Sequence, residues 1–509
     1  MSKKKFRYIP LRYVIAMLIT ILEILLIIGV AVYLSYKFQY FYFLAILTQI
    51  ICAVKIIASS DNPDYQVPWL VVVLVLPITG FMLYFIFSSK KLNRKYLKRL
   101  KEIVKNSYYK NDEGDFELIK SSSVEAYNQF NMLSKISGAH LFSNTESEYF
   151  GDMNKLLSRL ICDLENAKSF IFLEFFIIDG GEFWNKIHNI LIKKAQNGVD
   201  VRVVFDDIGC MKTLPSNYQK ILSNENIKAV TFSRLKVAPN GEFNNRNHRK
   251  MIIIDGIIGY TGGFNLADEY LNLINRFGFW KDCGLRLYGE GVWEFTKLFL
   301  IDYEINKKSV ISTPYNYFPK VNVEKFCGFV MPFGDGPKPL YPRQVSKSVI
   351  QNLLACAKKS VYITTPYLIV DNDLLTDIEN ASLRGVDVRI VVPHIPDKKL
   401  IYLMTKSYYP RLLSAGVKIY EYTPGFIHQK VYFVDGKYAM VGTVNLDYRS
   451  LVHHFENGVL LYKTKSINQV KKDLLAVFES CKLVNEQELK NTIFQRFICS
   501  LVSIFAPLM

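Results

Sequence analysis

Long apolar runs dominate the first 89 residues of the chain, and they predict membrane helices. The runs occupy residues 11–35, 40–58 and 66–88, and each is close to the roughly 20 residues that a helix needs to span a bilayer. The first run is too long for a cleaved signal peptide, and further apolar segments follow it where a cleavage site would stand. Residues 1–89 are therefore expected to form a membrane anchor of two or three apolar helices.

Basic residues flank this anchor on both sides. Lysines and arginines cluster at residues 3–7 and again at residues 90–101, and such clusters mark the cytoplasmic ends of membrane helices. Two cytoplasmic flanks require an even number of crossings, so one of the three runs should be re-entrant or interfacial. Pro77 makes the third run a candidate, and Lys55 makes the second run another. We expect a multi-pass membrane protein whose remaining residues face the cytoplasm.

Short apolar strands that alternate with helical stretches replace the long runs after residue 138, and this pattern occurs twice. AKSFIFLEFFII leads through a helical stretch to NGVDVRVVFDD in the first copy, and AKKSVYITTPYLIV leads to RGVDVRIVVPH in the second. A strand, a helix and another apolar strand are typical of a parallel sheet. Each copy then reaches two strands joined by a turn, at residues 247–270 and 427–450, with the same spacing of polar residues.

The duplication predicts an α/β fold class. We expect two duplicated domains with mixed sheets that meet around a pseudo-twofold axis, preceded by the helical membrane anchor. The expected boundaries place a basic and polar connector at 90–138, the first domain at 139–318, the second domain at 319–485 and a carboxyl-terminal apolar or amphipathic helix at 486–509.

A histidine and a lysine stand two residues apart on a predicted strand of each copy. Side chains two apart on a strand share a face, so His248 should lie beside Lys250, and His428 beside Lys430. A single pair of this kind would more often belong to an ordinary surface strand. Two pairs at matching positions of a duplicated domain favour one site that the halves build together.

Asparagines also recur, at positions 265 and 445, after Gly-containing turns where a strand is expected to lead into a helix. At such a position, free backbone amides and the helix dipole favour a bound anion, so Asn265 and Asn445 are candidate anion-binding residues. A residue that only caps the helix is the alternative, and the two roles are compatible.

Four acidic residues recur in the two copies. Asp255 and Asp435 each precede a glycine between two apolar strands, so their local role is a hairpin turn or a nearby salt bridge. Asp282 and Glu456 lie on later strands and are better placed to hold the imidazoles, because a carboxylate orients the base in other histidine-dependent enzymes.

Further residues are candidates for the wall of the site by their position. Glu174 and Tyr367 are expected to end corresponding strands of the two copies and to line the cleft. His453 and His454 stand close to the second motif and are candidates for the pocket wall as well.

Charge and cysteine content narrow the chemistry. The 63 basic and 46 acidic residues give a formal net charge of +17, which favours an anionic partner such as nucleic acid, a phosphorylated substrate or acidic lipid. Three apolar runs and the lack of an aromatic and basic repeat argue against nucleic acid. The eight cysteines lie far apart, with no CxxC pair and no zinc-like cluster with histidine. We therefore predict no metal and no cofactor.

The motif HxKx4D, which occurs twice with a downstream G(G/T)xN, resembles the paired motif of the phospholipase D superfamily. Nearly the whole chain is similar to the bacterial cardiolipin synthases, through the segments FIFLEFFI, GGFNLADEY, YITTPYLI and GTVNLDYRS. Two positions depart from the usual pattern, since Gly263 stands where the superfamily more usually has serine and Thr443 stands in the second copy.

The resemblance implies a metal-free phosphatidyl transfer in two steps at a bacterial cell membrane. In this mechanism His248 attacks phosphatidylglycerol to form a phosphohistidine, His428 protonates the departing glycerol, and a second phosphatidylglycerol then yields cardiolipin. The implied catalytic residues are His248, Lys250, Asp255, His428, Lys430 and Asp435. The implied substrate-binding residues are Asn265, Asn445, Asp282, Glu456, Glu174 and Tyr367. Phosphatidylglycerol and other anionic phospholipids of the bilayer are the implied partners.

Three other functions remain open at this stage. A phospholipase D that hydrolyses lipids or exchanges their headgroups would use the same motifs with a different acceptor. A nuclease of the superfamily would explain the positive charge but not the apolar runs. A non-catalytic membrane scaffold is the alternative from another class, although both histidine–lysine pairs are intact.

Overall fold

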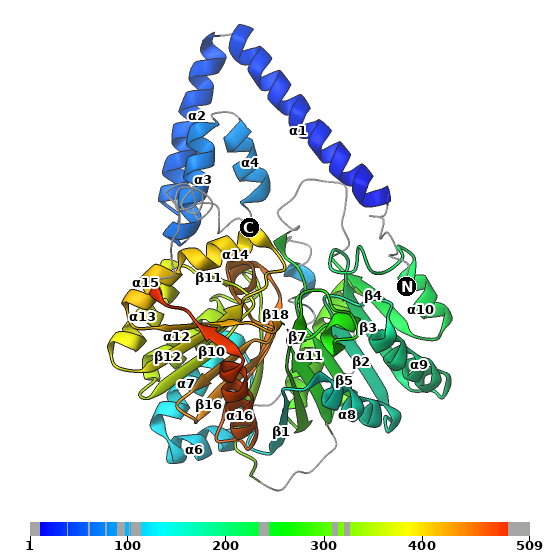
Figure 1. The fold of residues 1–509 in the computed structure, drawn as a ribbon. Helices are drawn as coiled ribbons and strands as arrows, with labels where there is room; N and C mark the ends of the chain where they lie inside the picture. The colour runs from blue at the N-terminus through cyan, green and yellow to red at the C-terminus, as the bar shows by residue number, and fades with distance from the viewer. Residues whose placement is uncertain are drawn as a thin grey trace.

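The computed structural model describes residues 11–37, 39–59, 62–76, 79–88, 97–100, 102, 113–233, 244–307, 314–319 and 326–486. Figure 1 shows four amino-terminal helices that stand above two α/β halves. Residues 90–96, 101 and 103–112 of the predicted connector and nearly all of the predicted carboxyl-terminal helix lie outside the described residues.

A seven-stranded mixed sheet forms the first half. Its order is β1 (Thr145–Phe150), β8 (Gly284–Gly289), β6 (Ile258–Gly262), β5 (Met251–Ile254), β2 (Phe170–Phe175), β3 (Asp200–Asp206) and β4 (Lys228–Phe232). Strands β2, β3 and β4 are parallel, as the expected strand–helix–strand pattern requires, and the hairpin of β5 and β6 adds antiparallel strands beside β2. The helices of this half are α8 (Met153–Glu165), α9 (Glu182–Gln196), α10 (Tyr218–Asn224) and α11 (Val292–Lys307), with the 3-10 turn η2 (Asp268–Leu271).

The second half repeats this arrangement in an eight-stranded mixed sheet. Its order is β19 (Cys481–Leu483), β13 (Lys418–Tyr422), β12 (Asp387–Pro393), β10 (Ser360–Thr364), β15 (Val431–Val434), β16 (Tyr438–Gly442), β18 (Glu456–Tyr462) and β9 (Phe329–Asp335). The helices are α12 (Val345–Cys356), α13 (Asn372–Leu383), α14 (Lys399–Ser407), α15 (Tyr409–Ser414) and α16 (Ser466–Glu479), with the π-helical turn η4 (Arg449–His453). The 3-10 turn η3 (Pro314–Tyr317) packs on the first half, where the Tyr317 ring contacts Phe170 of β2. The shared strand order confirms the duplicated α/β fold that the sequence predicts.

Two short backbone contacts join the halves beside the recurring histidines. Strand β7 (Phe279–Lys281) pairs in parallel with β14 (Gly425–Ile427), and Asn247 forms a bridge with Phe455. A further two-stranded sheet pairs β11 (Leu368–Ile369) with β17 (Leu446–Asp447) inside the second half. Apolar side chains from both large sheets share one buried cluster, so the halves form one body.

The described part of the connector packs on the second half. It consists of α6 (Glu113–Ser122) and α7 (Val124–Ser137). Phe130 and Leu133 of α7 are fully buried against Val349 and Leu353 of α12. The burial of these apolar residues fixes the connector to the body that it precedes.

The amino-terminal region consists of α1 (Leu11–Lys37), α2 (Gln39–Ile57), α3 (Pro63–Val75) and α4 (Thr79–Phe87). Within the described residues, α1 is the helix long and apolar enough to cross a membrane alone, over Met17–Leu34. The third apolar run is divided between the two short helices α3 and α4. The Gln49 amide of α2 donates to the carbonyls of Val73 and Leu74, each at 2.8 Å, at the end of α3.

The start of α3 docks on the second half. Asn62 Nδ2 donates to Asp371 Oδ2 at 2.8 Å, and Asp64 Oδ2 accepts the backbone N–H of Asn372 at 2.6 Å, at the beginning of α13. Tyr65 is buried and its ring lies 5.9 Å from that of His453. The apolar helices are thus held next to the same end of the second half that carries the recurring motif, as their position above α14 in Figure 1 also shows.

Candidate active site

The two recurring histidines are each held by a carboxylate from the opposite half. His248 Nδ1 donates to both oxygens of Glu456, each at 2.9 Å. His428 Nδ1 donates to Asp282 Oδ2 at 2.8 Å. Both carboxylates are buried, and they hold the imidazoles as the sequence predicts.

The backbone creates this crossed arrangement. The His248 N–H donates to the carbonyl of Phe455 at 2.8 Å, and the His428 N–H donates to the carbonyl of Lys281 at 2.7 Å. Phe455 and Lys281 directly precede the two carboxylate residues in the chain. The same backbone bond in both copies therefore brings each histidine to the acid of the other copy.

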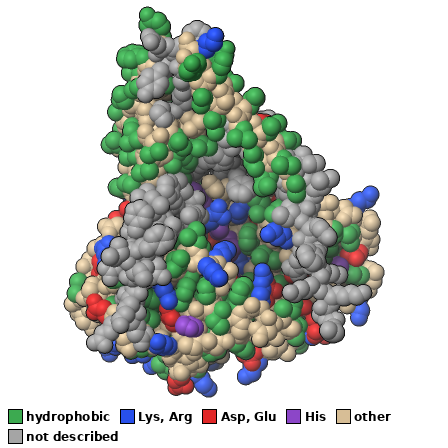
Figure 2. All heavy atoms as spheres, turned by 45° about the horizontal axis from the view of Figure 1, so that its top comes forward, with side chains coloured by type: hydrophobic (Ala, Val, Ile, Leu, Met, Phe, Trp, Pro, Cys, Tyr) green, Lys and Arg blue, Asp and Glu red, His purple; other side chains and the backbone are tan. Residues whose placement is uncertain are grey.

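Both imidazoles line one cavity of about 470 Å³ between the halves. Its wall includes His248, Asn265, Tyr270 and Trp280 from the first half and Tyr367, His428, Asn445 and Tyr448 from the second. Figure 2 shows lysine and arginine side chains gathered around a hollow below the apolar helices, with histidine among them. A single site thus receives both copies of the motif.

Burial favours the neutral form of both histidines. Burial lowers the pKa of His248 to about 3 and lowers the pKa of His428 well below its usual value. A neutral imidazole whose Nδ1–H points to a carboxylate has its lone pair on Nε2. Each ring can therefore present Nε2 as a nucleophile or proton acceptor.

The lysines of the motif are almost completely buried directly behind the histidines. Lys250 Nζ donates to the carbonyl of His248 at 2.7 Å, and Lys430 Nζ lies 2.9 Å from His428 Nε2. Burial lowers the pKa of Lys250 to about 7 and that of Lys430 to about 8. A bound phosphate would favour their charged forms, which neutralise anionic oxygens.

The two asparagines reach the cavity, but the helices expected after them do not form. Asn265 is followed by η2, a single turn, and Asn445 by the short strand β17. Asn265 Nδ2 donates to the Tyr270 hydroxyl at 2.6 Å, and Asn445 Nδ2 donates to Asp447 Oδ2 at 3.0 Å. A helix dipole therefore does not contribute to anion binding at either position.

Asp255 and Asp435 lie away from the cavity, which corrects their place in the implied catalytic set. Both have positive φ, 51° and 54°, in the turns after β5 and β15. The Asp255 carboxylate accepts the backbone N–H groups of residues 168 to 170, and Asp435 accepts those of residues 358 to 360. About 23 Å of extended chain separates Asp255 from His248, so these carboxylates fix the start of β2 and β10.

Glu174 and Tyr367 do not occupy corresponding places, contrary to expectation. Glu174 is opposite Met251 in the first sheet, where the second sheet has Thr364 opposite Val431. Glu174 is fully buried behind the cavity wall, where it accepts a hydrogen bond from Asn247 and burial raises its pKa. It is a structural residue and does not line the site.

Tyr367 does line the cavity, as expected. Its hydroxyl donates to Asp397 Oδ2 at 2.6 Å. His454 also lines the cavity, with its ring 5.3 Å from that of His248, and its Nδ1 lies 3.6 Å from Glu456 Oε1. His453 is buried behind it and is not among the lining residues.

Sequence reasoning missed the basic residues of the cavity wall. They are Arg246, Arg276, Lys398 and Arg449. Arg246 immediately precedes the first motif and Arg449 stands in the quoted segment GTVNLDYRS, so both were visible in the sequence. Nothing in their spacing showed that they face the same cavity.

Two imidazoles and one carboxylate at the His248 side of the cavity lie close enough together to share a cation. The ligand atoms of His248, His454 and Glu456 lie within 4.8 Å of one another, a cluster that the predicted absence of metal ligands did not foresee. Glu456 Oε1 already accepts a hydrogen bond from Ser450 at 2.6 Å. Hydrogen-bond donors already occupy the oxygens of this carboxylate. The cluster therefore needs no metal ion to satisfy it.

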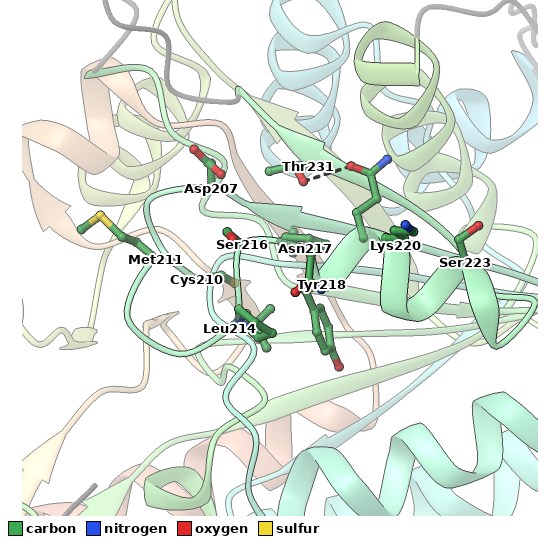
Figure 3. A pocket seen from close by; sticks show the side chains of 13 residues that line it. Asp207, Cys210, Met211, Leu214, Ser216, Asn217, Tyr218, Lys220, Ser223 and Thr231 are labelled. Carbon is green, nitrogen blue, oxygen red and sulfur yellow. Dashed lines mark hydrogen bonds between the residues drawn. The ribbon is translucent and has the colours of Figure 1, made fainter. Parts of the chain in front are cut away.

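A second cavity of similar volume, about 460 Å³, opens between β3 and α10 in the first half. Figure 3 shows Asp207, Tyr218, Lys220 and Thr231 at its wall. The Cys210 thiol there is buried, and burial raises its pKa, so the reactive thiolate is disfavoured. The reactive groups of the described chain gather in the cavity between the halves.

The fold and the paired, carboxylate-held imidazoles define a protein of the phospholipase D type. The family model described as cardiolipin synthase, PLD-like domain, matches residues 160–276 and 350–478, and a phospholipase D-nuclease N-terminal model matches residues 48–88. The cardiolipin synthase of Alkalihalophilus pseudofirmus is 33% identical, over 91% of this chain and 92% of its own length. The chain belongs to the cardiolipin synthase family of phospholipase D-like proteins.

Two further similarities extend this result. The cardiolipin synthase of Halalkalibacterium halodurans is 31% identical over 96% of this chain and 99% of its own length. The crystal structure of the phosphatidylserine synthase of Haemophilus influenzae is similar in fold, with a TM-score of 0.55 and 17% identity over 71% of this chain and 93% of that one. Together with the apolar α1, the cardiolipin synthase relatives indicate association with a membrane.

Proposed function

We propose that this enzyme is a cardiolipin synthase, a phosphatidyltransferase that joins two phosphatidylglycerol molecules and releases glycerol. The observation that carries the proposal is the single cavity in which His248 and His428 meet, each held by the carboxylate of the other half. Curated cardiolipin synthases that match over more than nine-tenths of the chain support the choice of reaction.

The first step forms a covalent intermediate. His248 Nε2 attacks the phosphorus of one phosphatidylglycerol, and the bond from phosphorus to the glycerol oxygen breaks as a phosphohistidine forms. Glu456 stabilises the positive charge that develops on the attacking ring. Binding of the anionic lipid raises the pKa of His428, so this imidazole carries the proton that the departing glycerol receives.

The second step reverses these roles. His428, now neutral, accepts the proton of a terminal hydroxyl on a second phosphatidylglycerol. That oxygen attacks the phosphorus, the bond to His248 breaks, and cardiolipin leaves. Lys250 and Lys430 stabilise the anionic oxygens in both steps, and Asn265 and Asn445 orient the phosphate.

The choice of His248 as the nucleophile follows from the carboxylate that holds it, Glu456. Glu456 accepts hydrogen bonds from Ser450 and Thr443 as well as from His248. These bonds fix the carboxylate, and the neighbouring imidazoles of His248 and His454 keep the pKa of Glu456 low against the effect of burial. A fixed anion at Nδ1 orients Nε2 and favours the charge that attack creates.

The proposal includes the setting of the enzyme. Residues 1–89 anchor it as a multi-pass protein of the bacterial cell membrane, and residues 139–318 and 319–485 form the two catalytic halves, which face the cytoplasm. Phosphatidylglycerol and other anionic lipids reach the cavity from the bilayer beside α3. Labelling of single cysteines in the two halves by a membrane-impermeant reagent should require permeabilised cells.

Purified protein in phosphatidylglycerol vesicles provides the test of the reaction. Cardiolipin and glycerol in equal amounts are expected. Phosphatidic acid as the main product would favour the alternative, a hydrolase, and exchange of free alcohols alone would favour headgroup exchange. No change in any lipid would favour a non-catalytic scaffold.

A further inference from the structure

We propose that Arg449 binds the phosphate of the second phosphatidylglycerol, the acceptor, while the terminal hydroxyl of that lipid reacts at the histidines. This inference rests on the proposed function and gives the cavity two unequal lipid sites. The donor phosphate occupies the histidine and lysine centre, and the acceptor phosphate occupies the side of the cavity formed by η4.

The reaction itself requires a second anion site. The acceptor lipid carries its own phosphodiester, separated from the reacting hydroxyl by a bridge of three glycerol carbons. Two phosphates therefore lie within one cavity when the hydroxyl attacks, and each is an anion in a site that excludes much of the water. The lysines behind the histidines serve the first phosphate, so the second needs a cation of its own.

Arg449 has the properties that such a site requires. It lines the same cavity as His248 and His428, and it is partly buried. Burial lowers its pKa, which Asp447 opposes and Arg246 reinforces. Arginine stays charged even so, and its planar fork matches two phosphate oxygens.

The other basic residues of the wall already have carboxylate partners. Arg246 Nη2 lies 2.8 Å from Asp206, Arg276 Nη1 lies 3.7 Å from Glu269, and Lys398 Nζ lies 4.0 Å from Asp397. Among the residues that the structure describes, no carboxylate comes within ion-pair distance of the Arg449 guanidinium. A partly buried cation without a protein anion is unfavourable unless a ligand supplies the opposite charge.

The duplication shows that this charge is specific to one side of the cavity. Arg449 follows Asn445 by four residues, and Glu269 follows Asn265 by four, so the two are equivalent positions of the repeat. Both line the cavity. Glu269 would repel a phosphate and can accept hydrogen bonds from hydroxyl groups, which suits the departing glycerol of the donor.

The test separates the two lipid sites by using two acceptors. Cardiolipin formation from phosphatidylglycerol requires both sites. Exchange of radiolabelled free glycerol into phosphatidylglycerol requires only the donor site, because glycerol carries no phosphate. Both rates are measured with the full-length protein in vesicles of the same composition.

Arg449→Gln should reduce cardiolipin formation about 10- to 100-fold, the range for loss of a hydrogen-bonded charge, and change glycerol exchange less than about threefold. Arg449→Lys keeps the charge without the fork, so it should recover part of the cardiolipin rate. Arg159→Gln is the matched control, since Arg159 is exposed on α8 and pairs with Asp163 four residues on; it should leave both rates unchanged.

An equal loss of both reactions in Arg449→Gln, or an unchanged cardiolipin rate, would overturn the acceptor site. If the glutamine variant does not fold, Arg449→Lys decides, because it must raise the half-saturating phosphatidylglycerol concentration for cardiolipin formation and spare exchange. Failure of the proposed function looks different, since the unmodified protein would then form no cardiolipin at all.

Discussion

The surroundings of His248 and His428 differ, although the two halves share their motif and their strand order. Glu456, which holds His248, also accepts bonds from Ser450 and from the Thr443 hydroxyl. Asp282, which holds His428, accepts the backbone N–H of Cys283 at 2.7 Å but has no hydroxyl donor among the described residues. The two carboxylates are therefore held differently, and this difference supports the separate roles proposed for the two histidines.

Gly263 explains this difference. It occupies the place of Thr443 in the repeat, and a Cβ there would lie 2.2 Å from Asp282 Oδ1 and 2.8 Å from the His428 carbonyl. Gly263 is needed so that Asp282 can reach His428. The Thr443 hydroxyl in turn binds Glu456, so neither position offers the substrate a hydroxyl.

Removal of either histidine tests the division of roles and has the largest expected effect. His248→Ala and His428→Ala should each reduce cardiolipin synthesis at least about 10⁴-fold, as for other catalytic groups that act as a unit. With a phosphatidyl donor whose leaving group needs no proton, His428→Ala should trap labelled protein and His248→Ala should remain unlabelled. The opposite labelling pattern would exchange the roles, and labelling of the double variant would exclude both.

Replacement of the carboxylates compares the two halves directly. Glu456→Gln should lower kcat about 10³-fold, because the nucleophile loses its orienting anion, as in other acid–imidazole pairs. Asp282→Asn should lower kcat about 10- to 100-fold, the range for a residue that orients another group. Steady-state rates in phosphatidylglycerol vesicles measure both. Equal losses would show that the two pairs are interchangeable.

The Gly263 and Thr443 positions sharpen the comparison with smaller changes. Gly263→Ala should lower the free energy of unfolding by about 1–3 kcal/mol, since the new methyl group overlaps Asp282. Thr443→Val should cost about 1 kcal/mol, because Glu456 loses one of several donors. Thermal unfolding in detergent with parallel rate measurements checks both. A Gly263→Ala variant with unchanged stability and rate would contradict the close approach of residue 263 to Asp282.

The pH dependence of stability and of kcat/KM should reflect the titration of Asp282, the carboxylate with fewer hydrogen-bond donors. Burial raises the pKa of Asp282 to about 6, above its unfolded value of about 3.9. The folded protein binds the extra proton, so this group adds stability as pH falls from about 6 to about 4. Protonation also removes the negative charge that Asp282 presents to His428, so kcat/KM should fall below pH 6, and Asp282→Asn should remove that acid limb. An unchanged acid limb in the variant would assign it to another group.

Excess chelator should leave the rate of cardiolipin synthesis unchanged. Among the described residues, the possible cation cluster of His248, His454 and Glu456 has no counterpart beside His428, where Trp280 takes the place of His454. A metal-free mechanism needs only the lysines. Loss of activity in chelator, restored by one divalent metal, would show that the half around His248 binds an ion.

The sequence predicts the parts of the site that repeat and misses those that depend on how the copies meet. His248, Lys250 and their counterparts could be paired because strand alternation and equal spacing are local properties. The crossing of Glu456 to His248 depends on contacts between distant segments. Glu174 and Tyr367 were aligned by their apolar surroundings alone, and only the strand register shows that Glu174 corresponds to Thr364.

The crossed pairing of histidines and carboxylates also bears on the ancestry of the chain. Two copies of a duplicated gene are usually free to diverge independently, but here each copy carries the acid that the other copy's imidazole needs. An ancestor with one copy could have completed either pair only by associating with a second molecule of itself. We therefore expect each histidine to have evolved together with the carboxylate of the other copy. His248 is paired in this way with Glu456, and His428 with Asp282.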